Sequence, residues 1–196
     1  MPNPDNNNLA SPDGATYLNS PVQKNSALFN TEYQHQCREA LAEAHAQYPL
    51  VYSIRCVLYF PAEQRENHFM SDDDIITNFV ESFKAQLLWD LSRALRRTLY
   101  RQEYCVRFAC AMEEQFDQTA FDVTILLNHT AIFELGDFMT ERNNNFKRIT
   151  GTWANTIGLP VTSGNALIYV PRNPYHHISR DDVDSIADFI KSISHI

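Results

Sequence analysis

Phe121-Asp122-Val123-Thr124-Ile125-Leu126-Leu127-Asn128 is the segment around which the rest of the chain can be arranged. Its apolar residues alternate, which is typical of a β-strand, and strong apolar segments on both sides can pair with it or pack on it, so we expect a central strand. Because successive side chains of a strand point to opposite faces, one face should carry Phe121, Val123, Ile125 and Leu127. The other should carry Ala120, Asp122, Thr124 and Leu126, and any functional site is expected there.

The N-terminal part divides into an arm and the start of a domain. Residues 1–29 are rich in Asn, Pro and Ser and hold few periodic apolar residues, which predicts a flexible arm, with residues 30–196 forming a single domain. Thr31 and Gln34 have the spacing of a capping box, so we expect a helix from Thr31 to about Gln47. Pro49 should end it.

The next two elements are a strand and the longest helix. Residues 51–60 are rich in β-branched and aromatic residues and are closed by Pro61, which predicts a strand. After a polar loop, Ser71 and Asp74 have the spacing of a second N-cap. The helix that they open carries apolar residues at spacings of three and four, which is the stripe of a helix that covers a sheet. These residues are Ile76, Phe79, Val80, Phe83, Leu87, Leu91 and Leu95.

The rest of the chain alternates strands and helices. Strands are expected at 104–112 and 121–128, joined by a polar connection longer than a tight turn, and at 165–170. A helix is expected at about 146–157, ended by Gly158, and a last one at 181–194. The last helix should turn inward the residues Val183, Ile186, Ile190 and Ile193.

The order of these elements predicts the fold class. From residue 51 it is β-α-β-β-α-β-α, which is the ferredoxin-like, split βαβ arrangement of an α+β protein, with an additional N-terminal helix and a C-terminal helix on an antiparallel sheet. In this arrangement the first and third strands are central. Two helices cover one face of the sheet and leave the other face open. Many unrelated proteins share this fold, so it does not name a function.

Composition bounds the partners and the compartment. The formal net charge of −8 argues against non-specific nucleic-acid binding, which depends on neutralising phosphates, although residues 84–107 hold six basic and only two acidic residues. No run of about 18 apolar residues and no basic, apolar leader is present, which predicts a cytoplasmic protein without a membrane contact. The cysteines lie in apolar stretches without CxxC spacing and should be buried free thiols. They are Cys37, Cys56, Cys105 and Cys110.

Several segments together carry a resemblance to a known family. In chain order they are 49–61 (PLVYSIRCVLYFP), 78–87 (NFVESFKAQL) with Asp90, 113–115 (EEQ), 121–128 (FDVTILLN) with 135–136 (LG), 152–159 (TWANTIGL) and 167–171 (LIYVP). In order and spacing, residues 48–194 resemble the inovirus gene-two-type replication proteins, which are grouped with the prophage proteins YagK and YfjJ through a shared C-terminal domain. That family in turn resembles the HUH endonucleases that start rolling-circle replication.

The resemblance implies a chemistry whose central residues are missing here. In HUH enzymes a His-hydrophobic-His pair on a central strand holds a divalent metal at the scissile phosphate, and a tyrosine on a later helix attacks that phosphate. This chain reads Ala120-Phe121-Asp122 at the pair and has no tyrosine at its C-terminal end. Asp122 and Glu114 are the remaining candidates for a catalytic Mg²⁺ or Mn²⁺ site. Tyr175 is the nearest substitute nucleophile. No other cofactor is implied.

The residues beside Tyr175 do not restore the missing pair. His176 and His177 are adjacent, so on a strand they would point to opposite faces and could not chelate one ion. We interpret them as histidines of a surface loop.

Two functional hypotheses follow, and a third stays open. The first is a nucleic-acid-binding pseudoenzyme of a phage or other mobile element, which binds single-stranded or stem-loop DNA on the open sheet face and on the arginine-rich helix end. Its candidate residues are Arg55, Arg107, Thr124, Arg93, Arg96, Arg97 and Arg101. The second is an acidic regulator, or an inhibitor of a host defence complex, with a basic protein partner. The third is an active metal-dependent single-strand DNA endonuclease that uses Asp122 and Glu114.

Overall fold

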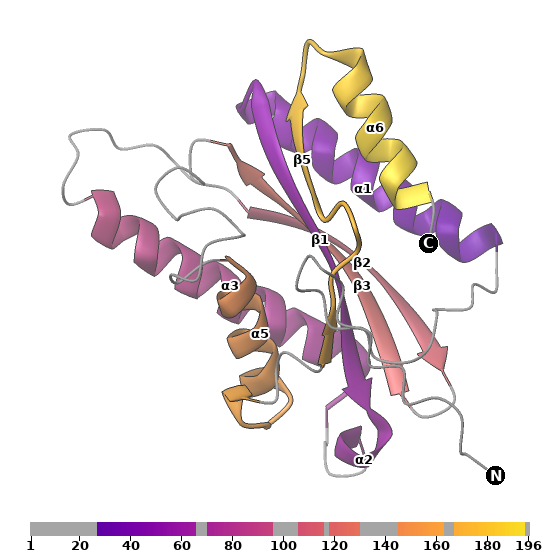
Figure 1. Cartoon of the computed structure of the whole chain (residues 1–196), viewed down its shortest axis with the longest axis vertical. Coiled ribbons are helices and arrows are strands. Elements are labelled where there is room, and N and C mark those ends of the chain that lie inside the picture. Colours follow the sequence, from indigo (N-terminus) through magenta and orange to yellow (C-terminus); the bar gives the residue numbers. More distant parts are fainter. Residues whose placement is uncertain are drawn as a thin grey trace, which may run out of the picture.

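The computed structural model describes residues 27–65, 70–95, 106–115, 118–129, 145–162 and 167–194. In these residues an antiparallel sheet is flanked by helices, which confirms the predicted α+β class (Figure 1). The helices are α1 (Ala27–Gln47), α2 (Ala62–Arg65), α3 (Asp72–Leu95), α5 (Asn145–Thr156) and α6 (Val183–Ser194). The strands are β1 (Leu50–Pro61), β2 (Val106–Gln115), β3 (Gln118–Asn128), β4 (Ile168–Tyr169) and β5 (Tyr175–Ser179).

The sheet has β1 and β3 at its centre. Its strand order is β2-β3-β1-β4, and β5 pairs with the same side of β1 as β4 does, nearer the start of that strand. β1 and β3 are paired along their whole shared length, from Val51 with Asn128 to Pro61 with Gln118. Every residue of β3 after Gln118 is buried. The prediction that residues 121–128 form a central strand is confirmed.

One face of the sheet, here called the α3/α5 face, carries the larger apolar core. The four β3 residues predicted to share a face, Phe121, Val123, Ile125 and Leu127, all lie in it, with alternate residues of β1 from Tyr52 to Phe60. The helices α3 and α5 cover it with their fully buried side chains. From α3 these are Ile75, Phe79, Phe83 and Leu87, and from α5 they are Ile149 and Trp153. Ile76 and Val80 of the predicted stripe are only partly buried, and the side chains of Leu91 and Leu95 lie outside the described part.

Trp153 is the largest side chain in this core and is completely buried. Its ring meets those of Phe60, Phe79 and Phe121 edge to face, at centroid distances of 6.4, 5.8 and 5.7 Å. Its indole Nε1–H donates to the carbonyl oxygen of Tyr59 at 3.0 Å, which satisfies the one polar atom of the side chain. Trp153 therefore ties α5 to β1, β3 and α3 at once.

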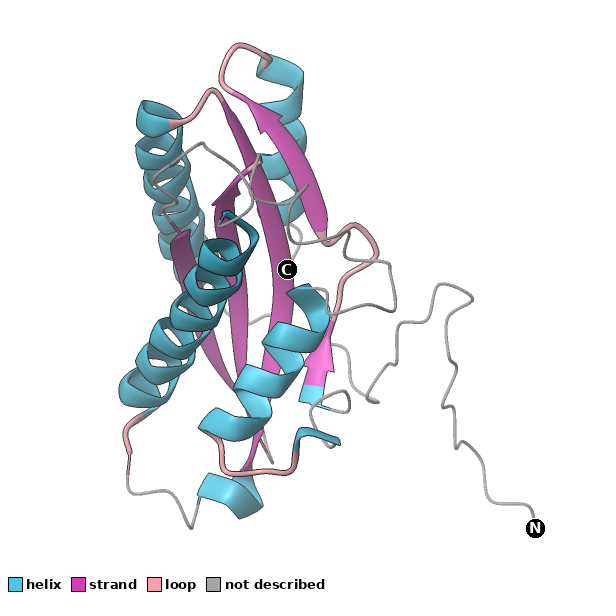
Figure 2. Cartoon of the chain, turned by 90° about the vertical axis from the view of Figure 1, so that its left-hand side faces the viewer, coloured by secondary structure: helices cyan, strands magenta, loops and turns pink. Residues whose placement is uncertain are grey.

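The opposite face, here called the α1/α6 face, is also covered. Figure 2 and Figure 1 show α1 and α6 together on the side of the sheet away from α3 and α5. α1 buries Tyr33, Cys37, Leu41 and Ala44 at helical spacing, and α6 buries Phe189 and Ile193. The sheet offers them Val51, Ala109, Ala111, Leu126 and Ile178. The expectation of an open face is therefore wrong where these helices lie, because apolar sheet residues must be buried against another layer.

Several boundaries differ from those predicted. α1 begins at Ala27, before the capping box at Thr31 and inside the segment expected to be an arm. The pair Gln115 with Gln118 closes the β2–β3 hairpin, so the predicted long connection is wrong: its polar residues continue both strands. His176 and His177, interpreted as histidines of a surface loop, lie instead in β5. On α6, Val183 is exposed rather than inward, and Phe189 takes the buried position.

The predicted end signals of two helices are confirmed. At the start of α3, the Ser71 hydroxyl accepts the backbone N–H of Asp74 at 3.2 Å and donates to its carboxylate at 2.6 Å. After α5, Gly158 has a φ of 73°, and the N–H of Leu159 donates back to the carbonyl of Ala154 at 2.8 Å, as in a glycine C-cap.

In the described residues, no helix is long and apolar enough to cross a membrane.

Candidate functional site

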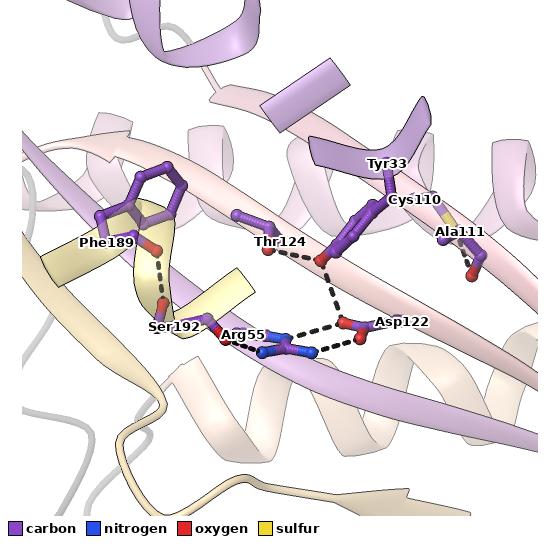
Figure 3. A network of polar contacts seen from close by, with 8 residues as sticks. All are labelled: Tyr33, Arg55, Cys110, Ala111, Asp122, Thr124, Phe189 and Ser192. Atoms are coloured by element: carbon purple, nitrogen blue, oxygen red, sulfur yellow. Dashed lines mark hydrogen bonds and ion pairs between the residues drawn. The ribbon is translucent and has the colours of Figure 1, made fainter. Parts of the chain in front are cut away.

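Asp122 and Arg55 form an ion pair on the α1/α6 face, at the centre of the sheet (Figure 3). The guanidinium meets the carboxylate with two hydrogen bonds, from Nε to Oδ1 at 3.0 Å and from Nη2 to Oδ2 at 2.6 Å. The Arg55 and Asp122 side chains are only 11% and 7% exposed. This two-point geometry is the strong, directional form of an arginine–carboxylate contact. Burial by itself would lower the pKa of Arg55, but its hydrogen bond to Asp122 raises that pKa above its ordinary value.

Tyr33 of α1 completes the contacts of this carboxylate. Its hydroxyl donates to Asp122 Oδ1 at 3.0 Å and lies 2.7 Å from the hydroxyl oxygen of Thr124. Because the tyrosine proton goes to the carboxylate, the Thr124 hydroxyl donates to the tyrosine oxygen. Burial, and next the charge of Asp122, raise the pKa of Tyr33 well above its ordinary value. The phenol therefore stays protonated and acts as a donor.

The C-terminal helix is joined to the same cluster. Arg55 Nη1 donates to the backbone carbonyl of Ser192 near the end of α6 (Figure 3). The side chains of Tyr33, Arg55, Asp122 and Thr124, with this carbonyl, are called the buried polar cluster below. It connects α1, β1, β3 and α6, and each of its polar groups contacts another. Such a cluster favours one orientation of the helices on the sheet, because another packing would leave a buried charge without its counter-charge.

Burial disfavours the thiolate form of the cysteines near the cluster. Cys37 and Cys56 are buried, Cys110 is partly buried, and all three are free, as predicted; Cys105 lies outside the described residues. Burial raises the pKa of the Cys37 thiol to about 12, and burial likewise raises that of Cys110 to about 12. Thiols held in the neutral form are poor nucleophiles and poor metal ligands.

The predicted metal pair, Asp122 with Glu114, is not brought together by the strand register. β2 pairs Ala111 with Asp122 and Glu114 with Thr119, so positions 114 and 122 belong to opposite faces of the sheet. The side chain of Glu114 itself is not among those described. Both carboxylate oxygens of Asp122 already accept from Arg55, and the neighbouring Ala120 is buried. A cation at Asp122 would have to displace the guanidinium.

The predicted nucleic-acid-binding residues divide into two groups. Arg55 and Thr124 are held in the buried polar cluster, and Arg107, 12% exposed, donates from Nε to Glu43 of α1 at 3.1 Å. All three contact other groups of the protein instead of standing on an open sheet face, which corrects the expectation of an open face. The other group is the arginine-rich end of α3. The side chain of Arg93, and all of Arg96, Arg97 and Arg101, lie outside the described part of the chain.

Tyr175 points to the α3/α5 face of the sheet, which is the face opposite the polar cluster. It is 38% exposed, and its ring stacks on that of Tyr52 at 6.0 Å. The next residue, His176, packs against Phe189 of α6 at 6.1 Å, whereas His177 lies 5.1 Å from Tyr52. The prediction that the adjacent histidines point to opposite faces is confirmed. Tyr175 therefore faces away from Asp122 and cannot act with it on one phosphate.

Sequence reasoning missed two contributors to the buried polar cluster and one contact on the other face of the sheet. Tyr33 could have been found, because it begins the apolar stripe of α1 that continues through Cys37 and Leu41. Ser192 contributes a backbone oxygen, for which no residue type is a signal. His129 lies just after β3, with its ring 4.8 Å from that of His177 on β5. Nothing in the sequence signals that contact, because it depends on which strands lie beside β1.

Comparison with known proteins gives a matching family and a curated relative. The model of the YagK/YfjJ C-terminal domain family matches residues 13–195. The chain is similar to the uncharacterized protein YfjJ of Escherichia coli (strain K12), with 25% identity over 135 residues. That match covers 65% of this chain and 65% of the relative, so the chain spans a little less than two thirds of that protein. No solved structure matches it.

Proposed function

The chain belongs to the YagK/YfjJ C-terminal domain family, and from this membership we propose that it is a nucleic-acid-binding relative of the inovirus gene-two-type replication proteins that does not nick DNA. Its setting would be the bacterial cytoplasm, in a cell that carries a phage or another mobile element. One observation carries the proposal: the carboxylate at the position of the expected metal ligand, Asp122, is closed off by Arg55 and Tyr33.

We also propose that the sheet is a ferredoxin-like core with additions, and its strand order supports this. β1 and β3 are central, β2 and β4 flank them, and α3 and α5 lie on one face, as in a split βαβ fold. The second strand on the β4 side, β5, and the second helical layer of α1 and α6 are additions to that arrangement. These additions cover the face on which an initiator would hold its metal.

The closed cluster predicts that the protein does not cleave DNA with Mg²⁺ or Mn²⁺. Metal-assisted transfer needs a protein-bound ion with an open coordination position for the scissile phosphate. Asp122 cannot hold such an ion while Arg55 donates to both of its carboxylate oxygens. We expect a labelled single-stranded stem-loop to stay intact during prolonged incubation with either ion. Cleavage that disappears in Asp122→Ala but survives in Tyr175→Phe would contradict the proposal and restore Asp122 as a ligand.

The proposed DNA contact is the arginine-rich segment that begins in the last turn of α3. Residues 93–101 contain Arg93, Arg96, Arg97 and Arg101 and no acidic residue. The described surface elsewhere is acidic: exposed carboxylates gather at Asp73 and Asp74, and again at Asp181, Asp182, Asp184 and Asp188. Phosphates are repelled there and attracted to the arginines, so binding should be local and sensitive to salt.

Fluorescence anisotropy with a labelled single-stranded stem-loop tests this contact. We expect micromolar binding at low salt that weakens steeply as salt rises, because bound cations are released from the strand. In Arg96→Ala/Arg97→Ala the salt dependence should become shallower by about 1.4 in log–log slope, from roughly 0.7 per lost phosphate contact. Arg38→Ala/Arg172→Ala is the matched control, since both arginines are exposed and lie outside this segment. Equal losses in the two double variants would contradict the placement.

A second function is favoured by a different observation. The net charge is −8, and two neighbouring apolar side chains of α3 are exposed, Leu88 at 46% and Trp89 at 63%. An acidic surface with an exposed tryptophan suits a basic protein partner, such as a component of a host defence complex, because charge steers the encounter and an aromatic anchor holds it. If no DNA binding is seen at low salt, the protein-binding function is the one favoured. Its test is whether Trp89→Ala fails to capture the basic partner.

A further inference from the structure

The strand β2 forms one edge of the sheet, outside β3 (Figure 1). Among the described strands it pairs with β3 alone, so its other side presents a row of backbone groups to which no described strand is paired. It is ten residues long and keeps one register with β3 from Val106 to Gln115, without a bulge. Residues 106–112 contain no proline and no lysine. Natural proteins use short strands, bulges, proline and lysine to keep an edge from pairing, and β2 has none of these devices there.

The other side of the sheet is interrupted in the usual way. There β4 has two residues and β5 has five. The segment between them contains Pro171 and Pro174, which lack the backbone N–H that a further strand would need. Of the two sides of the described sheet, the β2 side is therefore the one suited to backbone pairing.

The side chains of β2 on the α3/α5 face leave apolar surface at this edge. Phe108 and Cys110 are only partly buried against the core, and Met112 is 38% exposed. The ring of Phe108 meets that of Phe83 on α3 edge to face at 6.0 Å, and Lys84 Nζ lies 5.6 Å from its centre. Phe108 is therefore held in place while part of it stays accessible. A further strand beside β2 would cover this row of three side chains.

The order of residues along β2 is complementary to that of a second β2 laid antiparallel to it. In a symmetric antiparallel pair the twofold axis passes beside one residue, and residues at equal distances before and after it face each other. With the axis at Cys110, Phe108 faces Met112 of the second copy, and an aromatic ring and a thioether sulfur attract each other. Arg107 then faces Glu113 of the second copy on the α1/α6 face, so opposite charges meet twice.

We propose that two copies of this chain associate through β2, antiparallel and centred on Cys110, so that their sheets join into one continuous sheet. The occupant of the edge is a second copy, because the apolar row and the charges of β2 are complementary to β2 itself. Moving the axis to Ala109 or Ala111 would separate Arg107 from Glu113, so the charges select the register. The association goes beyond the proposed nucleic-acid function and does not depend on it.

Sedimentation velocity of the full chain over a series of concentrations tests this association. We expect a dimer that dissociates on dilution. Met112→Lys should weaken dimerisation by roughly tenfold or more, because it brings an ammonium group against the apolar ring of Phe108. Val183→Lys is the matched control, since Val183 is 78% exposed and lies on α6, outside the sheet. It should dimerise like the unaltered chain.

Two charge reversals test the register. Arg107→Glu and Glu113→Arg should each be monomeric at a concentration where the unaltered chain is dimeric, since like charges then face each other at both ends. When the two variants are mixed in equal amounts they should form a dimer, because every arginine faces a glutamate again. Glu43→Gln is the control, since it alters the contact of Arg107 within its own chain and leaves the charges of β2 unchanged. It should stay dimeric.

Circular dichroism checks that each variant is folded. If a charge reversal does not fold, Met112→Lys is compared with Met112→Leu, which keeps the edge apolar and should keep the dimer. A chain that stays monomeric at every concentration, a dimer that Met112→Lys leaves unchanged, or a mixture of the two charge variants that stays monomeric would each overturn the proposal.

Discussion

Replacing Asp122 by alanine is expected to lower the free energy of unfolding by about 3–5 kcal/mol, because it leaves the guanidinium of Arg55 buried without its counter-charge. The loss should be large here, since the pair is hardly exposed and Arg55 has no other carboxylate partner among the ion pairs of the described residues. The hydroxyl of Tyr33 loses its acceptor as well. Urea unfolding followed by circular dichroism measures the change.

Two matched variants separate the charge effect from the loss of packing. Tyr33→Phe removes one donor to Asp122 and leaves the ion pair, so it should cost about 1–3 kcal/mol. Arg55→Met/Asp122→Leu removes both charges and fills the space with apolar atoms, and it should cost clearly less than Asp122→Ala, since no buried charge remains. A double variant as unstable as Asp122→Ala would mean that the unpaired guanidinium is not the cause of the loss. A loss below about 1 kcal/mol in Asp122→Ala would contradict the closed cluster.

Trp153→Ala is expected to lower the free energy of unfolding by about 3–5 kcal/mol, as the removal of a fully buried aromatic ring leaves a cavity that its neighbours fill only in part. Three aromatic rings, from Phe60, Phe79 and Phe121, lose their edge contacts with the indole. The carbonyl of Tyr59 loses the indole N–H as a donor. The same urea unfolding experiment measures the effect.

The chain supplies its own control for this substitution. Trp89 lies on α3 with 63% of its surface exposed, so Trp89→Ala should change the free energy of unfolding by about 0.5 kcal/mol or less. Trp153→Phe keeps most of the ring volume and loses the hydrogen bond, and should fall between the two. Equal effects of Trp89→Ala and Trp153→Ala would show that α5 does not pack on the sheet as described.

Local signals in the sequence account for most of the elements. The alternation in 121–128 depends only on the two-residue repeat of a strand, and it assigns the faces of β3 correctly. Ser71 and Gly158 act through hydrogen bonds and backbone angles within one or two turns, so they mark the helix ends wherever the helix lies. The polar residues at 113–115 and 118–119 misled the prediction, because a strand at its end tolerates polar side chains.

The functional interpretation of Asp122 and Arg55 shows what such signals leave open. The sequence places both on one face of the sheet, and the family resemblance implies that a metal pair is missing at Ala120-Phe121-Asp122. It does not show that α1 and α6 cover that face, since the expected split βαβ order leaves it open. With the helices in place, the same two residues change from a candidate surface site to a buried ion pair.

By itself, then, the sequence determined the strand and helix periods, the two sides of the central strand, the α+β class and the resemblance to a family. Tertiary structure alone decided that both faces are covered, that 175–179 is a strand, and that His129 meets His177. The physical reason is range. Periodicity and caps are set by neighbours in the chain, whereas a face is covered, a charge buried or two rings brought together by packing between segments that are far apart in sequence.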